Sequence, residues 1–208
     1  MTDAHAAPRT ARLRRWLATE GRSILLTVAL LVLARTSFAN HYQVPSGSME
    51  PTLRPGDRVV VDMSAYGLRV PFTELQLLPR GEPRRGEVVV FRSPADGVRL
   101  IKRVVATAGD RVELRAGRLA INGRPVSHSQ APEVEIFGER QARLGLDMGG
   151  GPDIAPTRIP PGKVLVLGDH RGASADGRHF GLVDADRIYA RALGVYWRGG
   201  EGFVWNAL

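Results

Sequence analysis

The chain has 208 residues, of which 43% are hydrophobic and 24% charged, a composition that fits one globular domain with room for a small insert. It contains no cysteine, which excludes disulfides, thiol catalysis and thiolate metal sites, and its five histidines show no metal-ligand spacing. The formal net charge is +8, carried by scattered arginines. A solvated surface or attraction to anionic lipid explains this scatter better than nucleic-acid binding, so we expect no nucleic-acid partner.

The first recognisable element is an apolar segment near the N-terminus. Residues 24–34 (ILLTVALLVLA) are apolar except for one threonine, and arginines cluster before them, whereas only Arg35 follows closely. Eleven residues are too few for a membrane span, which needs about 20, but an extension from Trp16 to Phe38 gives enough length. The arginine asymmetry then places the N-terminus in the cytoplasm and the rest of the chain outside.

The same segment also resembles a secretory signal peptide, with residues 37–39 (SFA) as its cleavage site. The residues that follow favour a retained anchor. We therefore expect residues 1–41 to form a basic cytoplasmic N-terminus and a membrane anchor helix, and residues 42–208 to form an extracytoplasmic domain.

The pattern after the anchor indicates β-structure. Short apolar runs between turn residues predict strands over residues 59–61, 87–92, 98–107, 163–167 and 187–197, and a hairpin over 110–121. No stretch after Ala39 has helical periodicity. Residues 130–161 are rich in Gly and Pro and weakly patterned, and residues 149–152 (GGGP) predict a mobile loop. We expect a mainly β fold built from antiparallel sheets.

Ser48 lies in a short loop, residues 45–51 (PSGSMEP), that a proline stiffens on each side. Such a loop presents a serine with an open approach, although a serine that merely caps a turn has the same appearance. The stretch does not match the Gly-x-Ser-x-Gly elbow, because the second residue after Ser48 is Glu50.

Lys102 is unusual because nearly all positive charge in this chain is arginine; Lys163 is the only other lysine. In a regular strand, Lys102 shares a face with Leu100 and Val104. Burial there lowers the pKa of a lysine by up to about 3–5 units, and a neutral amine can take a proton from a serine hydroxyl. The alternative is a lysine that snorkels to solvent or pairs with a carboxylate.

The rival mechanism is a Ser-His-Asp triad. Its available histidines are His41, His128, His170 and His179, and none has a triad context. A Ser–Lys dyad needs only one general base.

A polar segment, residues 168–181 (GDHRGASADGRHFG), follows the predicted strand 163–167. Asp176 and Arg178 can pair there, and Ser174 can hydrogen-bond to a lysine amine and orient it. The alternative is a loop held by Asx turns and a surface salt bridge of little energetic value.

Three sequence blocks, taken in their order along the chain, resemble the bacterial type I signal peptidases, which are membrane-anchored Ser–Lys endopeptidases. They are residues 44–53 (VPSGSMEPTL), residues 85–91 (RGEVVVF) with 100–104 (LIKRV), and residues 168–181. Residues 65–68 (AYGL) also resemble the family's segment between the first two blocks. The resemblance implies a signal-peptidase-like β catalytic domain over residues 42–208, after one N-terminal transmembrane helix.

The resemblance also implies a role for individual residues. Ser48 would be the nucleophile and Lys102 the general base, and the Ser48 backbone N–H and the Ser46 hydroxyl would form the oxyanion hole. The residues that would orient or brace this pair are Ser174, Asp176 and Arg178. The residues that would line shallow apolar pockets for small side chains are Val44, Met49, Leu53, Leu100 and Ile101. Neither a metal nor an organic cofactor is expected.

The substrate implied is a preprotein whose signal peptide ends in an Ala-x-Ala-like sequence, cut at the outer face of the cytoplasmic membrane, with membrane lipid as the other partner. An alternative is a specialised processing peptidase of the same family for one secretion or conjugation system. A third interpretation is an inert membrane-tethered β binding module. A self-cleaving repressor domain is disfavoured by the apolar N-terminal segment.

The chain departs from the family pattern at three positions and in length. His170 and Ala173 stand where the family usually has Asn, and Gly177 stands where it usually has Ser. We therefore expect different hydrogen bonding around Asp169 and Asp176. The accessory insert at about residues 113–162 is expected to be reduced to a hairpin and a loop.

Overall fold

The computed structural model describes residues 20–28, 39–69, 76–128 and 130–208. Residues 20–28 are helical. Within these ranges, no helix is both long and apolar enough to cross a membrane. Most of the segment predicted to be the anchor, from Trp16 to Phe38, lies outside the described residues, so the anchor stays a prediction.

The centre of the fold is an eight-stranded sheet in the order β1-β2-β16-β5-β6-β14-β15, with β17 paired to β16. All its neighbouring strands are antiparallel. Its strands are β1 (Ala39–Gln43), β2 (Arg58–Asp62), β5 (Val88–Arg92), β6 (Arg99–Ala106), β14 (Lys163–Leu167), β15 (Val183–Asp184), β16 (Ile188–Arg198) and β17 (Gly202–Ala207). The five single strands predicted from apolar runs are β2, β5, β6, β14 and β16, so those predictions are confirmed.

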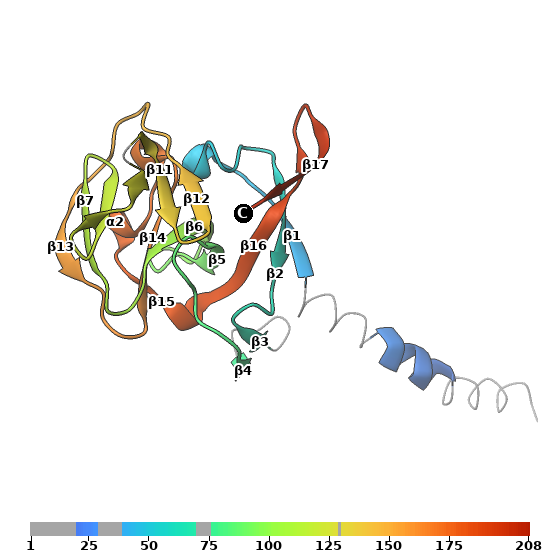
Figure 1. Ribbon diagram of the computed structural model, residues 1–208. Helices are drawn as coiled ribbons and strands as arrows, with labels where there is room; N and C mark the ends of the chain where they lie inside the picture. Colours follow the sequence, from blue (N-terminus) through green and yellow to red (C-terminus); the bar gives the residue numbers. More distant parts are fainter. Residues whose placement is uncertain (1–19, 29–38, 70–75, 129) are drawn as a thin grey trace, which may run out of the picture.

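Three smaller sheets complete the β-structure. The first has the order β13-β7-β8-β9, the second β10-β11-β12 and the third β3-β4. Their strands are β3 (Gly67–Arg69), β4 (Gln76–Pro79), β7 (Arg111–Arg115), β8 (Arg118–Ile121), β9 (Arg124–Pro125), β10 (Ser127–His128), β11 (Ala131–Phe137), β12 (Arg140–Arg143) and β13 (Ile154–Arg158). The first two lie beside the β6–β14 part of the main sheet, away from β1 and β17 (Figure 1).

Helical structure after Ala39 is limited, within the described residues, to four short segments. They are η1 (Gly47–Met49), η2 (Arg171–Ala173), α2 (Gly177–Phe180) and η3 (Ala185–Arg187). The sequence pattern predicted no helix after Ala39, and the described part of the chain agrees apart from these short segments. The predicted hairpin is also confirmed: it is formed by β7 and β8, with a turn at Ala116 and Gly117.

Residues 130–161, whose sequence pattern is weak and predicted no strand, hold β11, β12 and β13. The reason is visible in β11, where Glu135 is fully buried and forms an ion pair of 2.6 Å with Arg171. A charged residue at a buried position breaks the apolar alternation from which strands are recognised. Only the folded chain shows that this charge has a buried partner.

Residues 149–152 form a loop, as predicted, and this loop packs closely against its neighbours at Gly150. The backbone of Gly150 lies so close to the β7–β8 turn that a Cβ there would come within 2.1 Å of the Ala116 carbonyl carbon. Arg178 Nη1 also donates a hydrogen bond of 2.7 Å to the Gly150 carbonyl. Glycine is required here by close packing rather than by mobility.

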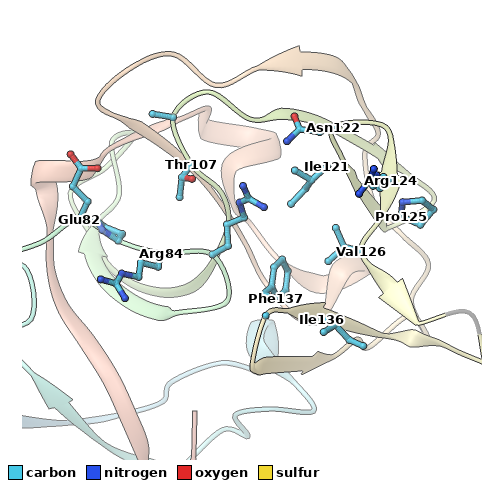
Figure 2. Close-up of a pocket in the computed structure, with 14 residues that line it drawn as sticks. Glu82, Arg84, Thr107, Ile121, Asn122, Arg124, Pro125, Val126, Ile136 and Phe137 are labelled. Atoms are coloured by element: carbon cyan, nitrogen blue, oxygen red, sulfur yellow. The ribbon is translucent and has the colours of Figure 1, made fainter.

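A wide cleft of about 1090 Å³ opens between the loop before β5 and the small sheets (Figure 2). Glu82 and Arg84 lie on one side, Asn122 and Arg124 on the other, and Phe137 in between. The residues that line it include neither Ser48 nor Lys102. Its size therefore does not mark the place of the chemistry.

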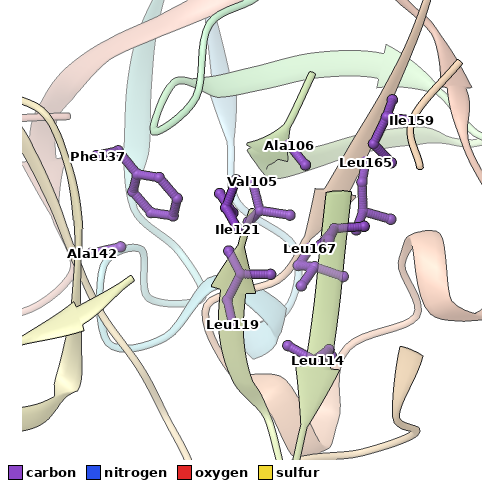
Figure 3. Packing of buried hydrophobic residues seen from close by; sticks show 11 residues of the cluster. Val105, Ala106, Leu114, Leu119, Ile121, Phe137, Ala142, Ile159, Leu165 and Leu167 are labelled. Carbon is purple, nitrogen blue, oxygen red and sulfur yellow. The ribbon is translucent and has the colours of Figure 1, made fainter. Parts of the chain in front are cut away.

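The first two small sheets are joined to the main sheet by a common apolar core (Figure 3). Val105 of β6 and Leu165 and Leu167 of β14 pack with Leu114 and Leu119 of the hairpin, and all five are at most 2% exposed. Their burial anchors the accessory sheets to the strand that carries Lys102. A second cluster lies under β1, β2, β5 and β16 and includes the buried side chains that follow Ser48.

Candidate active site

Ser48 is presented by the short helix η1, which follows β1 and starts after Ser46. Met49 and Leu53, both fully buried, fasten the loop to the core on either side of the Glu50-Pro51 pair. The Ser48 side chain is left half-buried at the surface. An N–H in the first turn of a helix has no partner within the helix, and no described residue accepts a hydrogen bond from the Ser48 N–H.

Lys102 reaches this serine from β6. Its side chain is 3% exposed, which confirms the predicted burial, and its Nζ donates a hydrogen bond of 2.5 Å to Ser48 Oγ. The pKa of Lys102 is lowered to about 8, chiefly by burial and also by the charge of Arg178, although the carboxylates of Asp176 and Asp169 oppose the shift. An amine with this pKa is partly neutral near physiological pH.

A pH dependence follows directly from this pKa. If Lys102 must be neutral to take a proton, activity is lost as pH falls through about 8 and is regained above it. The neutral fraction rises roughly tenfold between pH 7 and pH 9. We expect kcat/KM for a peptide substrate to rise by this factor over that range. A profile that is flat or falls there would contradict a role for the neutral amine.

The Ser46 hydroxyl lies next to the nucleophile. Its Oγ donates a long hydrogen bond of 3.4 Å to Ser48 Oγ, and the residue is exposed. The predicted oxyanion donors, the Ser46 hydroxyl and the Ser48 N–H, are therefore both beside the reacting oxygen. Their role stays a prediction.

Ser174 lies at the site but makes no hydrogen bond to Lys102. It is 6% exposed, and its hydroxyl is a buried oxygen without a hydrogen-bond partner among the described residues. A Cβ on Gly168 would lie 2.2 Å from this oxygen, so glycine makes room for it. The predicted orienting role therefore stays a prediction.

Asp176 and Arg178 form the predicted pair in a bidentate geometry. Arg178 Nε and Nη2 each donate to the Asp176 carboxylate at 2.8 Å, and both side chains are fully buried. Asp176 also accepts a hydrogen bond of 2.9 Å from the Gly168 N–H. Burial raises the pKa of Asp176, but the hydrogen bonds from Arg178 and Gly168 more than offset this and lower it. The alternative of a surface salt bridge is excluded by the burial.

A second buried pair was not predicted. Arg103 Nε and Nη2 donate to the Asp169 carboxylate at 2.8 and 2.7 Å, and Thr52 Oγ1 donates to the same carboxylate at 2.5 Å. This cluster joins the nucleophile loop, the strand of Lys102 and the polar segment 168–181. The signal in the sequence was an arginine adjacent to Lys102 in an otherwise apolar strand, but its partner lies 66 residues away.

Arg171 and Glu135 form a third buried pair that sequence reasoning missed. Arg171 donates to Glu135 from two nitrogens at 2.6 and 3.0 Å, and it also bonds to the Gly117 carbonyl. It thereby ties the polar segment to the accessory sheets.

The five residues predicted to line the apolar pockets do not lie in one cluster. Val44, Met49 and Leu53 are buried members of one cluster, against which Ile101 packs. Leu100 packs against a different cluster around Phe91. Met49 and Leu53 are both fully buried within the first of these clusters. Within the described residues, no group of three or more His, Asp and Glu side chains is arranged to hold a metal ion.

A mainly antiparallel β fold that places a loop serine against a buried lysine points to the class of serine peptidases. Residues 13–197 match the family model described as "Signal peptidase, peptidase S26". The chain therefore belongs to the signal peptidase family, peptidase S26.

Relatives agree with this family. Signal peptidase I of Pseudomonas aeruginosa is 32% identical over 202 residues, covering 85% of this chain and 71% of the relative. Signal peptidase I T of Bacillus subtilis is 29% identical over 196 residues, covering 94% of this chain and 91% of the relative. A crystal structure of a signal peptidase I from Enterococcus faecalis is 27% identical and covers 60% of this chain and 97% of that one, with a TM-score of only 0.39.

Proposed function

We propose that this chain is a serine endopeptidase that removes signal peptides from secreted preproteins, with Ser48 as nucleophile and Lys102 as general base. The observation that carries the proposal is the contact of 2.5 Å between a buried lysine amine and the hydroxyl of an accessible loop serine. Membership of the signal peptidase family supports the choice of substrate class.

The chemistry follows from the geometry. Ser48 Oγ attacks the scissile carbonyl carbon while Lys102 Nζ takes the hydroxyl proton, and the Ser48 N–H and the Ser46 hydroxyl stabilise the oxyanion. Lys102 then gives the proton to the leaving amine, which leaves an ester on Ser48. In the second step Lys102 takes a proton from water, which attacks the ester, and the proton returns to Ser48 as the acid product leaves.

The sheet leaves room for an extended substrate beside Lys102. β14 pairs with β6 at Arg103, Val104 and Ala106, so the preceding residues of β6, from Arg99 to Lys102, extend beyond the end of β14. We infer that the signal peptide adds there as a strand, next to the serine loop. Small side chains, as in an Ala-x-Ala-like sequence, would fit over a floor made by Met49 and Leu53.

We propose that cleavage occurs at the outer face of the cytoplasmic membrane. The support is the apolar segment with arginines before it and almost none after it. Residues 1–41 would anchor the chain in lipid, and residues 42–208 would form the extracytoplasmic catalytic domain, with a reduced accessory insert at about residues 113–162.

Two alternatives differ in measurable ways. A specialised peptidase for one secretion or conjugation system would cleave one member of a panel of preproteins and leave the rest intact. An inert binding module would cleave none, and its Ser48 would not be labelled by a serine-directed acylating probe.

The substrate assignment is tested with the purified full chain and one preprotein. We expect a single cut after an Ala-x-Ala-like sequence, identified by N-terminal sequencing of the product. Replacing the alanine before the cut by Phe is expected to lower kcat/KM by about 100-fold or more, because a shallow floor of buried side chains has no room for a ring. Equal cleavage of both preproteins would contradict the proposed pocket, whereas no cleavage of either would contradict the function.

A further inference from the structure

His170 contacts the serine loop through both its backbone and its side chain. Its backbone N–H donates a hydrogen bond of 3.2 Å to the Ser48 carbonyl, and its Nδ1 lies 3.3 Å from the Gly47 carbonyl oxygen. The imidazole is only 9% exposed.

The contact with Gly47 concerns the peptide unit that matters most for the proposed chemistry. The Gly47 carbonyl and the Ser48 N–H belong to one planar trans peptide, so they point in opposite directions. The Glu50 N–H already donates to the Gly47 oxygen at 2.9 Å, and a second donor there helps to fix the direction of the Ser48 N–H. It also polarises the peptide, which makes that N–H a stronger donor.

The contacts that the structure describes for the imidazole nitrogens are with acceptors. Besides Gly47, the Asp147 carboxylate lies 3.0 Å from Nε2 and the Glu50 carboxylate 3.8 Å from Nδ1. Two cations, Arg54 and Arg143, line the same cleft of about 420 Å³ as His170. A neutral imidazole carries one N–H and can serve one side only, whereas the imidazolium donates to both. In agreement, Nε2 makes no aligned hydrogen bond in this structure despite its distance from Asp147.

We propose that His170 is a positioning residue that orients and polarises the Gly47–Ser48 peptide as the oxyanion donor, and that its imidazolium form does so best. The proposal deepens the proposed function and rests on it. Only the imidazolium carries an N–H on both ring nitrogens, so this contribution grows as the imidazole gains its second proton.

The test compares two amides with the imidazole. Asn places its NH₂ near the position of Nδ1 and can still donate to Gly47, whereas Gln places its NH₂ near Nε2 and cannot. We expect His170→Gln to lower kcat by about tenfold with KM changed by less than about twofold, and His170→Asn to retain more than about a third of kcat at pH 8. The exposed His179 supplies the matched control, His179→Gln, which should match the wild type.

The pH dependence separates positioning from simple packing. Because the titration of Lys102 is common to all variants, it cancels in the ratio of wild-type to His170→Asn kcat. We expect this ratio to rise as the pH falls from about 8 to about 5.5. A flat ratio, together with His170→Gln as fast as His170→Asn, would overturn the inference while leaving the peptidase function standing. An inactive wild type would overturn both.

A second readout applies if His170→Gln does not fold. The Ser48 amide ¹⁵N–¹H shift can be followed between about pH 5.5 and pH 7.5 in the wild type and in His170→Asn. A titration in the wild type that disappears in the variant supports the inference. Identical curves refute it.

Discussion

Lys102→Arg is expected to lower kcat by about 1,000-fold, the contribution of a well-placed general base. Arginine keeps the positive charge but cannot lose its proton in a protein, so it cannot take one from the Ser48 hydroxyl. The substitution therefore separates the need for a neutral amine from the need for a cation. The measurement is single-turnover cleavage of a preprotein by the purified full chain, with Ser48→Ala as the reference for complete loss.

The matched control is Lys163→Arg, at the only other lysine. Lys163 is about one-third exposed and pairs with Asp184 at 2.5 Å, an interaction that arginine can replace. Its activity should equal that of the wild type. The proposed mechanism would be wrong if Lys102→Arg retained more than about a tenth of the wild-type rate. Loss of labelling of Ser48 by an acylating probe should accompany the loss of cleavage.

Arg103→Met is expected to lower the free energy of unfolding by about 3–5 kcal/mol, the largest stability effect in the site. The Arg103 and Asp169 side chains are 2% and 0% exposed, so removal of the guanidinium leaves a buried carboxylate without its cation. The free energy would be measured by urea denaturation of the detergent-solubilised chain.

Two comparisons show whether burial is the cause. Arg54 pairs with Glu201 at the surface, with both side chains about half exposed, and Arg54→Met should cost less than about 1 kcal/mol. Arg103→Met combined with Asp169→Leu should be more stable than Arg103→Met alone, because the uncompensated charge is gone. If Arg103→Met and Arg54→Met cost the same, Arg103 has no special structural role.

The strands that surround the site were predictable because each carries its own signal. β5 and β14 are short apolar runs bounded by turn residues, and β6 has an alternation that places Lys102 between two apolar neighbours. The strand β11 was not predicted, because its fully buried Glu135 is stabilised by Arg171, which lies far along the chain. Local patterns cannot record such a partner.

The serine loop and the pairing of Asp176 with Arg178 could likewise be named from the sequence. The burial of these residues could not be predicted from the sequence. An aspartate and an arginine two positions apart suggested an ion pair, but a surface pair and a fully buried pair have the same sequence spacing. The difference matters, because Asp176 is one of the carboxylates that oppose the lowering of the Lys102 pKa.

Residue chemistry and spacing, read along the chain, were sufficient to select the β class, the candidate serine and lysine, and the family they resemble. The three-dimensional arrangement alone established that Nζ of Lys102 meets Oγ of Ser48, that Arg103 is neutralised by Asp169, and that an imidazole faces the Gly47 carbonyl. The physical reason is the sequence separation over which each kind of interaction acts. Periodicity and turn chemistry act between neighbours in the chain, whereas desolvation and hydrogen-bond geometry depend on segments that only folding brings together.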